Sequence, residues 1–221
     1  MYKSIKYNIQ GGYTLLEILI GIGLGLFILA NGIFMYSTIV KSYYDLLAAT
    51  RLDEQLRSSM NLMVKEIRRA GYSSNAIANL KVGANNNVFM AAANDIKIPS
   101  SSCILFTYDS DSSGILPALN AANYDKRFGF RLSGTILQSR ALTDSSFDCN
   151  SGTWENLTDS KVIQINSLSF ISAPAVTTLN STDSLTIRNI TISISAQLKN
   201  DSGVTKTITD TVRVRNDRFQ P

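Results

Sequence analysis

The 221-residue chain contains no histidine. Histidine is the commonest general base near neutral pH and the commonest metal ligand, so its absence removes the usual centre of hydrolytic and metal chemistry. Serines are plentiful, but no Gly-x-Ser-x-Gly elbow presents one as a nucleophile. The acidic residues Asp144 and Asp148 lie in a serine-rich loop and fit turn chemistry. We therefore expect no enzyme, no catalytic residue and no organic cofactor.

Charged residues are missing from one long stretch. Residues 18–40 are 23 positions without Asp, Glu, Lys or Arg, and a helix needs about 20 apolar residues to cross a bilayer. Lys3 and Lys6 precede this run, so the N-terminus is expected in the cytoplasm and the remainder on the periplasmic or outer side. Without these two lysines the net charge of +4 falls to +2, which does not by itself indicate nucleic-acid binding.

Cysteine is also scarce. Cys103 and Cys149 are the two in the chain, and both follow the apolar run. Disulfides persist in the compartment where this part of the chain is expected to lie. We predict a Cys103–Cys149 bridge; the alternative is two free, buried thiols.

The junction at the head of the apolar run has a specific pattern. Gly11 and Gly12 precede the run, Tyr13 follows them, and Glu17 is the fifth residue after Gly12. An ordinary secretory signal has its cleavage site after the apolar region instead. The string Gly-Tyr-Thr-Leu-Leu-Glu resembles the class III signal of type IV pilins and type II secretion pseudopilins, in which Phe is usual at the position of Tyr13. The alternative is a signal anchor whose glycine pair is accidental.

This resemblance implies a set of roles at the junction. A prepilin peptidase would cut between Gly12 and Tyr13, remove the leader 1–12 and leave Tyr13 as the N-methylated mature N-terminus. Glu17 would lie about 6 Å along the helix from the new amine. In filament assembly it would pair with the amine of a neighbouring subunit, because an unpaired carboxylate in hydrocarbon is costly. The alternative is that Glu17 lies in the headgroup layer.

Apolar periodicity predicts one long helix over residues 13–71, with a transmembrane half (13–40) and an amphipathic half (41–71). The second half carries a stripe spaced at 4, 4, 3 and 4 residues, typical of one buried helix face, and Gly71 suits the position after the helix. Glycines in the first half have two readings, close helix packing or local unwinding on entry into a filament. The stripe consists of Leu52, Leu56, Met60, Met63 and Ile67, and the glycines are Gly21, Gly23, Gly25 and Gly32.

Residues 72–221 predict a β-rich head domain. After a long polar loop over 72–102, alternating patterns predict strands and a hairpin around Ser133 and Gly134. Phase inversion at Leu185 and Ile187 predicts a bulge near Arg188 and Asn189. The predicted strands cover residues 104–108, 127–132, 135–142, 162–172, 185–198 and 204–215. An antiparallel sheet against the amphipathic half-helix buries both apolar faces, which gives an α+β class and, by the resemblance, a pilin fold.

Two weaker binding candidates remain in the head. Asp109, Asp111 and Ser113, followed by Gly114, match the start of a calcium loop, but the twelfth position is Asn120 and a polar turn explains the same residues. Arg213 and Arg215 share a strand face that could bind DNA phosphates. A solvated sheet face explains them equally, and the absence of interleaved aromatic residues makes nucleic acid unlikely.

Three segments narrow the resemblance to the PilW-type minor pilins: residues 62–72, residues 149–154 with 162–170, and residues 212–216. It implies a minor pilin that primes type IV pilus assembly from the inner membrane, with a periplasmic head, and lies at the pilus tip afterwards. Its partners would be other minor pilins, the major pilin, a tip adhesin of the PilC/PilY family, prepilin peptidase and the assembly platform of the inner membrane. The alternatives are a J-type minor pseudopilin of a type II secretion system and a DNA-uptake receptor.

Overall fold

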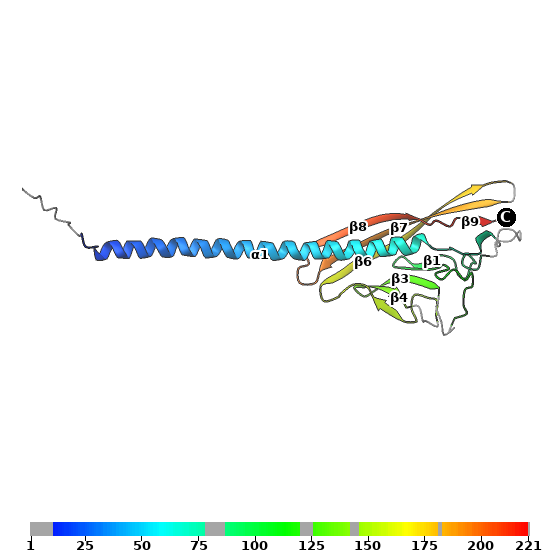
Figure 1. Ribbon diagram of the computed structural model, residues 1–221, viewed down its shortest axis with the longest axis horizontal. Coiled ribbons are helices and arrows are strands. Elements are labelled where there is room, and N and C mark those ends of the chain that lie inside the picture. The colour runs from blue at the N-terminus through cyan, green and yellow to red at the C-terminus, as the bar shows by residue number, and fades with distance from the viewer. Residues whose placement is uncertain (1–10, 78–86, 120–125, 142–145, 181–182, 221) are drawn as a thin grey trace, which may run out of the picture. The chain divides into compact units, whose positions relative to one another are not determined.

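The computed structural model describes residues 11–77, 87–119, 126–141, 146–180 and 183–220 (Figure 1). The chain divides into two compact units, residues 1–47 and 48–221, and each is described by itself. The predicted leader falls largely outside the described residues, as do Asn120 and Asp144.

The first unit contains the beginning of α1, the helix Leu15–Arg68. Its side chains are exposed throughout residues 11–39, and α1 is long and apolar enough to cross a membrane by length and composition. The four glycines of this part have open space where a Cβ would lie. Packing within the chain therefore requires none of these glycines. Both interpretations, close packing against other helices and local unwinding in a filament, stay open.

In the second unit, one face of α1 packs on a sheet. The predicted stripe is confirmed, since Leu52, Leu56, Met60, Met63 and Ile67 are all buried. The sheet has the order β6-β7-β8, and β9 pairs with β7 (Figure 1). Alternation along β7 supplies the inner face with buried isoleucines. These strands are β6 (Ile163–Thr178), β7 (Ser184–Leu198), β8 (Thr205–Arg213) and β9 (Arg218–Gln220).

The remaining strands form a second antiparallel sheet, in the sequential order β1-β2-β3-β4-β5. The predicted hairpin around Ser133 and Gly134 joins β3 to β4, with Gly134 at a φ of 59°. The strands are β1 (Lys97–Ser100), β2 (Cys103–Thr107), β3 (Arg127–Ser133), β4 (Ile136–Arg140) and β5 (Trp154–Asn156). The α+β class is thus confirmed, with the strands divided over two sheets and with short strands β1, β5 and β9 that periodicity did not indicate.

The predicted bulge near Arg188 is wrong. β7 pairs with β6 without a register shift on either side of Arg188, and the shift lies in β6, between Ile165 and Ser167. The apolar pattern changes phase because Arg188 itself takes a buried, inward-facing position. There its guanidinium binds Asp95 and donates to the carbonyl of Asn216 at 2.6 Å.

The end of α1 is closed by the C-terminal part of the chain. The backbone N–H of Arg215 donates to the carbonyl of Arg68 at 3.0 Å. The side-chain amide of Asn216 donates to the carbonyls of Arg69 and Ala70 at 3.3 and 3.1 Å. Gly71 follows at a φ of 75°, where a Cβ would lie 2.7 Å from Met90. These contacts, called the helix-end clasp below, satisfy carbonyls that a helix end leaves without partners.

Truncation of the stripe should destabilise the head strongly. We expect Met63→Ala to lower the free energy of unfolding by about 2–5 kcal/mol, because Met63 is fully buried and its loss leaves a cavity. Leu62→Ala is the control, since Leu62 is 38% exposed on the neighbouring face, and it should cost less than about 1 kcal/mol. Urea unfolding of the full chain in detergent, followed by the fluorescence of Trp154, measures both, and equal losses would contradict this packing.

Candidate functional site

The predicted processing junction lies just outside the helix. Residues 11–14 are not helical, and Tyr13 is 82% exposed. The backbone N–H of Glu17 donates to the hydroxyl and the carbonyl of Thr14, at 3.3 and 3.1 Å. Thr14 therefore caps α1, at the Thr-x-x-Glu spacing of a capping box, of which the half contributed by Thr14 is formed. The bond between Gly12 and Tyr13 is thus exposed and free of helical hydrogen bonding.

Glu17 lies in the first turn of α1. A carboxylate is favoured there by the partial positive charge of the helix N-terminus. Sequence reasoning assigned Glu17 a role between subunits and overlooked the cap, although the Thr-x-x-Glu signature was readable. The two roles are compatible, because the cap uses the backbone N–H of Glu17 and leaves its carboxylate for a partner.

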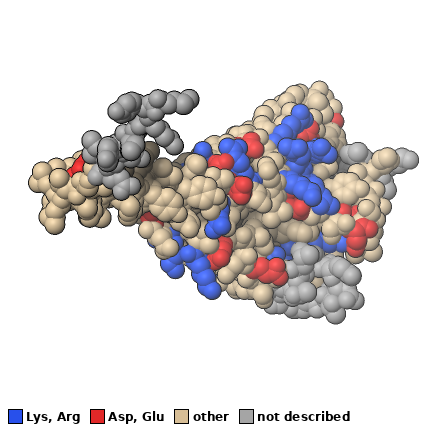
Figure 2. All heavy atoms as spheres, turned by 60° about the vertical axis from the view of Figure 1, so that its left-hand side comes forward, with Lys and Arg blue, Asp and Glu red and all other residues tan. Residues whose placement is uncertain are grey.

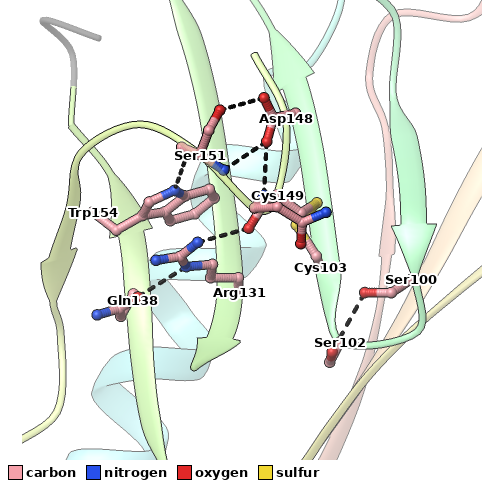
Figure 3. The surroundings of a disulfide bond; sticks show 10 residues. Ser100, Ser102, Cys103, Arg131, Gln138, Asp148, Cys149, Ser151 and Trp154 are labelled. Carbon is pink, nitrogen blue, oxygen red and sulfur yellow. Dashed lines mark hydrogen bonds between the residues drawn. A yellow bond between two sulfur atoms is a disulfide. The ribbon is translucent and has the colours of Figure 1, made fainter. Parts of the chain in front are cut away.

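Cys103 and Cys149 form a disulfide with a Cα–Cα distance of 6.3 Å (Figure 3). It ties the start of β2 to the loop that precedes β5. The guanidinium of Arg131 donates to the carbonyl of Cys149 at 2.6 Å and lies 4.4 Å from the ring centroid of Trp154. Trp154 therefore covers Arg131 beside the disulfide, and it is half-buried rather than a core residue.

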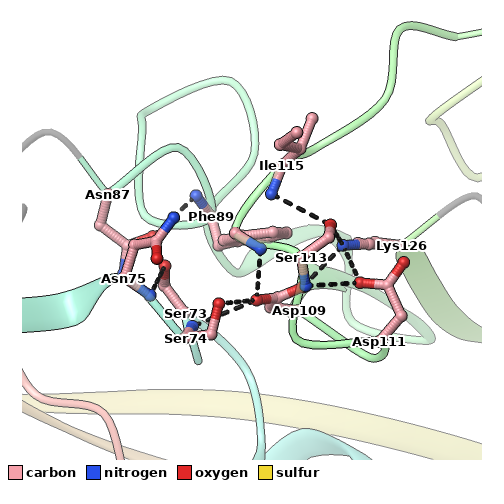
Figure 4. A network of polar contacts seen from close by, with 11 residues as sticks. Ser73, Ser74, Asn75, Asn87, Phe89, Asp109, Asp111, Ser113, Ile115 and Lys126 are labelled. Carbon is pink, nitrogen blue, oxygen red and sulfur yellow. Dashed lines mark hydrogen bonds and ion pairs between the residues drawn. The ribbon is translucent and has the colours of Figure 1, made fainter.

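The predicted calcium candidates gather around Lys126 (Figure 4). Its ammonium donates to Asp109 and Ser113 at 2.6 Å each, and also to Asp111. These are the oxygens at positions 1, 3 and 5 of the candidate loop, so the chain supplies its own cation to them. Within the described residues, no group of three or more acidic or cysteine side chains is arranged to hold a metal.

Asp109 also connects this loop to the segment that follows α1. Its second carboxylate oxygen accepts bonds from the N–H and hydroxyl of Ser74 and from the N–H of Gly114, at 2.7–3.1 Å. Burial by itself would raise the pKa of Asp109, but the hydrogen bonds from Lys126, Ser74 and Gly114 outweigh it and hold the pKa well below its usual range. Lys126 and Asp109 are both almost completely buried, so the pair is a structural element of the head.

The basic residues of the predicted DNA-binding face do not form an unpaired stripe. Arg213 pairs with Asp217 at 3.0 Å, and Lys206 lies 3.5 Å from Asp53. Arg215, whose backbone belongs to the helix-end clasp, lines a shallow hollow of about 450 Å³ together with Arg68 and Arg213. On the face shown in Figure 2, basic and acidic side chains are interspersed.

The second unit decides the family. A family model described as prepilin peptidase-dependent protein B matches residues 45–214. The chain belongs to this family. Among curated proteins and solved structures, none matches the chain.

Membership makes the chain a pilin-like component of the type IV pilus or pseudopilus kind. The match to prepilin peptidase-dependent protein B covers both cysteines and strands β1 to β8, but it begins after the junction and ends just before Arg215 and Asn216, the donors of the helix-end clasp. Gly12, Tyr13 and Glu17 are therefore an independent indication of the same class. The apolar helix and the family together indicate membrane anchoring.

Removal of the internal cation should destabilise the head and change its response to acid. Lys126→Met leaves a buried carboxylate unpaired, which should cost about 3–5 kcal/mol at neutral pH. Lys161→Met, at an exposed position, is the control.

Because the folded-state pKa of Asp109 is depressed, its contribution to stability is present above its unfolded pKa of about 3.9 and is lost as pH falls below that value. Urea unfolding between pH 7 and pH 2 should therefore show a smaller loss of stability for Lys126→Met than for the wild type. Calcium calorimetry on the wild type should give no binding heat, and a clear heat would contradict the assignment of Lys126 as the cation of this loop.

Reduction of the disulfide should loosen the head. Its cysteines are 46 residues apart, and a loop of this size contributes roughly 4 kcal/mol in the chain-entropy model. We expect dithiothreitol and the double variant Cys103→Ser/Cys149→Ser to lower the free energy of unfolding equally. Peptide mapping of the exported protein without reductant should recover the cross-linked peptide, and its absence would contradict the bridge.

Proposed function

We propose that this chain is a PilW-type minor pilin, which helps to prime assembly of a type IV pilus and lies at the pilus tip after cleavage by prepilin peptidase. The observation that carries the proposal is the exposed Gly12–Tyr13 bond directly before a capped, membrane-length helix. A peptidase needs an extended, accessible substrate, and the cap at Thr14 begins the helix immediately after the cut.

The head supports the PilW-type assignment through the segments that carry the resemblance. Two of them, residues 62–72 and 212–216, meet in the helix-end clasp, where Asn216 and Arg215 bind the last carbonyls of α1. The third surrounds the disulfide, with Cys149 and Trp154 joined through Arg131. The resemblance thus lies in the contacts that give the head its shape, and a shaped head is what a priming subunit presents to the next one.

Assembly is proposed to depend on Glu17 and the new amine of Tyr13. In a bundle of parallel helices, an amine of one subunit and the carboxylate of the next form an ion pair that the apolar surroundings strengthen. This ion pair would fix the axial position of each subunit relative to the next. Contacts of the head domain with other minor pilins, the major pilin and a tip adhesin would reinforce that position. The work is assembly, and we propose no enzymatic activity and no cofactor.

The alternative of a J-type minor pseudopilin uses the same helix, cleavage and head. It differs in the assembly that the subunit primes, so the phenotype of a deletion separates the two. Loss of surface pili with normal secretion supports the minor pilin. Loss of secretion with normal pili supports the pseudopilin. The DNA-uptake alternative requires salt-dependent DNA binding by the protein at low ionic strength.

Complementation of a deletion strain tests the proposal and the role of Glu17 together. We expect the wild type to restore surface pili and Glu17→Ala to restore at most a few per cent of them, because the variant loses the partner of the amine. Glu54→Ala removes an exposed acid from the second unit and should restore pili fully. Sheared pili are quantified by electron microscopy and immunoblot, with membrane levels of each variant as the control for expression. Full piliation by Glu17→Ala would contradict the pairing.

A further inference from the structure

The sheet that covers α1 continues beyond the end of the helix. The far ends of β6 and β7 extend past α1 in Figure 1, and β9 lies along β7 there. Opposite residues of the two strands share a face, so Ser172, Pro174 and Val176 lie on the same inner face as Ile190, Arg188 and Thr186. This part of the inner face is left without the helix that covers the rest.

A cavity of about 330 Å³ lies on this uncovered face, against β1. We call it the arm groove. Its walls are partly apolar, its charged groups are two arginines and one aspartate, and Ser172 and Thr186 add two hydroxyl groups. Besides these two, the groove is lined by Asp95, Ile96, Ile98, Pro174, Arg188, Ile190 and Arg218.

The charges in the arm groove do not balance. Asp95 binds Arg188, and its second oxygen lies 3.6 Å from Arg218. Among the described residues this contact is the one ion pair of Arg218, whose side chain makes no hydrogen bond to them. The carboxylate of Asp95 is thus shared by the guanidinium groups of Arg188 and Arg218. With one negative and two positive side chains, the groove carries a net charge of +1.

Two donors in the groove also lack acceptors. The Nε atoms of Arg188 and Arg218 are buried and have no hydrogen-bond partner. A buried donor without a partner is costly, and a guanidinium fork matches a carboxylate in shape and charge. Arg218 is a third exposed, so a ligand reaches it from solvent. A second carboxylate would supply both the acceptor and the negative charge that the groove lacks.

The surroundings indicate that this carboxylate is carried on an apolar chain. Val176, on the inner face at the rim, is 64% exposed, and residues 162–182 contain no charged side chain. β6 is the outer strand of its sheet, and natural edge strands are usually protected by charge. The uncharged strand β6 therefore lies next to the two guanidinium groups of the groove. This combination suits an acidic side chain that is flanked by apolar residues.

We propose that the arm groove binds an aspartate or glutamate side chain on an apolar segment of a neighbouring subunit. Arg218 takes the carboxylate, and Pro174 and Val176 contact the flanking side chains. The identity of the partner rests on the proposed function, because a pilin-like head in an assembly contacts other subunits. The binding chemistry of the groove does not depend on it.

A direct test uses the full chain in detergent micelles and a defined probe. The probe is the tripeptide acetyl-Val-Glu-Val-amide, with acetyl-Val-Gln-Val-amide as its matched neutral control. Binding is followed by the Nε–Hε NMR resonances of Arg188 and Arg218. We expect the glutamate peptide to shift both resonances with saturation. The glutamine peptide should bind at least about tenfold more weakly, because its neutral amide accepts hydrogen bonds from the guanidinium groups but forms no ion pair with them.

Variants assign the response to the groove. Arg218→Gln and Val176→Asp should each weaken binding of the glutamate peptide at least tenfold, the first by removal of the cation and the second by repulsion. Both side chains are partly exposed, and that of Arg218 makes no hydrogen bond to the described residues, so the fold should be retained. Arg213→Gln is the control outside the groove and should bind normally.

Several outcomes overturn the inference. These are equal binding of the two peptides, unchanged binding by Arg218→Gln, and binding of acetate as tight as that of the glutamate peptide, which would show a site for small anions. Binding of octanoate without binding of the peptide would assign the groove to a fatty acid instead. A deletion strain that keeps its pili would remove the proposed pilus role while leaving peptide binding intact, so the two failures are distinguishable.

Discussion

The burial of one apolar stripe of α1 against a sheet is the constraint on which the rest of the head depends. A single helix cannot bury its own apolar face, and the β6-β7-β8 sheet offers the matching surface. The stripe ends at Ile67, and the helix must end soon after it, at the point where the polypeptide turns into the second sheet. Every carbonyl released by that ending needs a donor, because the helix end is covered by other parts of the chain.

The helix-end clasp answers that need with residues from the far end of the sequence. Asn216 is 147 positions from Arg69, yet its side chain caps the last turn. Its own carbonyl accepts from Arg188, which in turn binds Asp95. The helix end, the last strands and the loop before β1 are therefore joined by one chain of hydrogen bonds. Such a network favours this arrangement, because the loss of any one of these bonds would leave a further buried polar group without its partner.

Sequence reasoning reached the parts of this structure that local pattern encodes. The stripe was predictable because residues three and four apart share a helix face. The main strands were predictable from alternation, and the cysteine pair from the side of the membrane on which it was expected. Thr14 was also within reach as a capping-box residue.

The remaining features depend on contacts between distant residues, which periodicity does not record. The sequence pattern suggested a calcium loop at Asp109, Asp111 and Ser113. Residue spacing shows that these oxygens converge, but it cannot show that Lys126 lies between them. Arg188 interrupts an apolar alternation, which suggested a bulge. Its ion-pair partner Asp95 is 93 positions away in the sequence, so the pattern could not show that Arg188 is buried as half of a pair. In both cases a charge was placed inside the head, and a buried charge is tolerated only with a partner of opposite sign.

These internal charges differ in a way that bears on function. Lys126 is enclosed and fully bonded, with two carboxylates and a hydroxyl around one ammonium, so that site is closed within the chain. At the arm groove one carboxylate faces two guanidinium groups, and one of these groups is partly exposed. A closed site stabilises its own subunit, whereas an open site of unbalanced charge gains stability from what binds to it. In a protein whose proposed work is assembly, the second kind of site is where contact with a neighbour would be favourable.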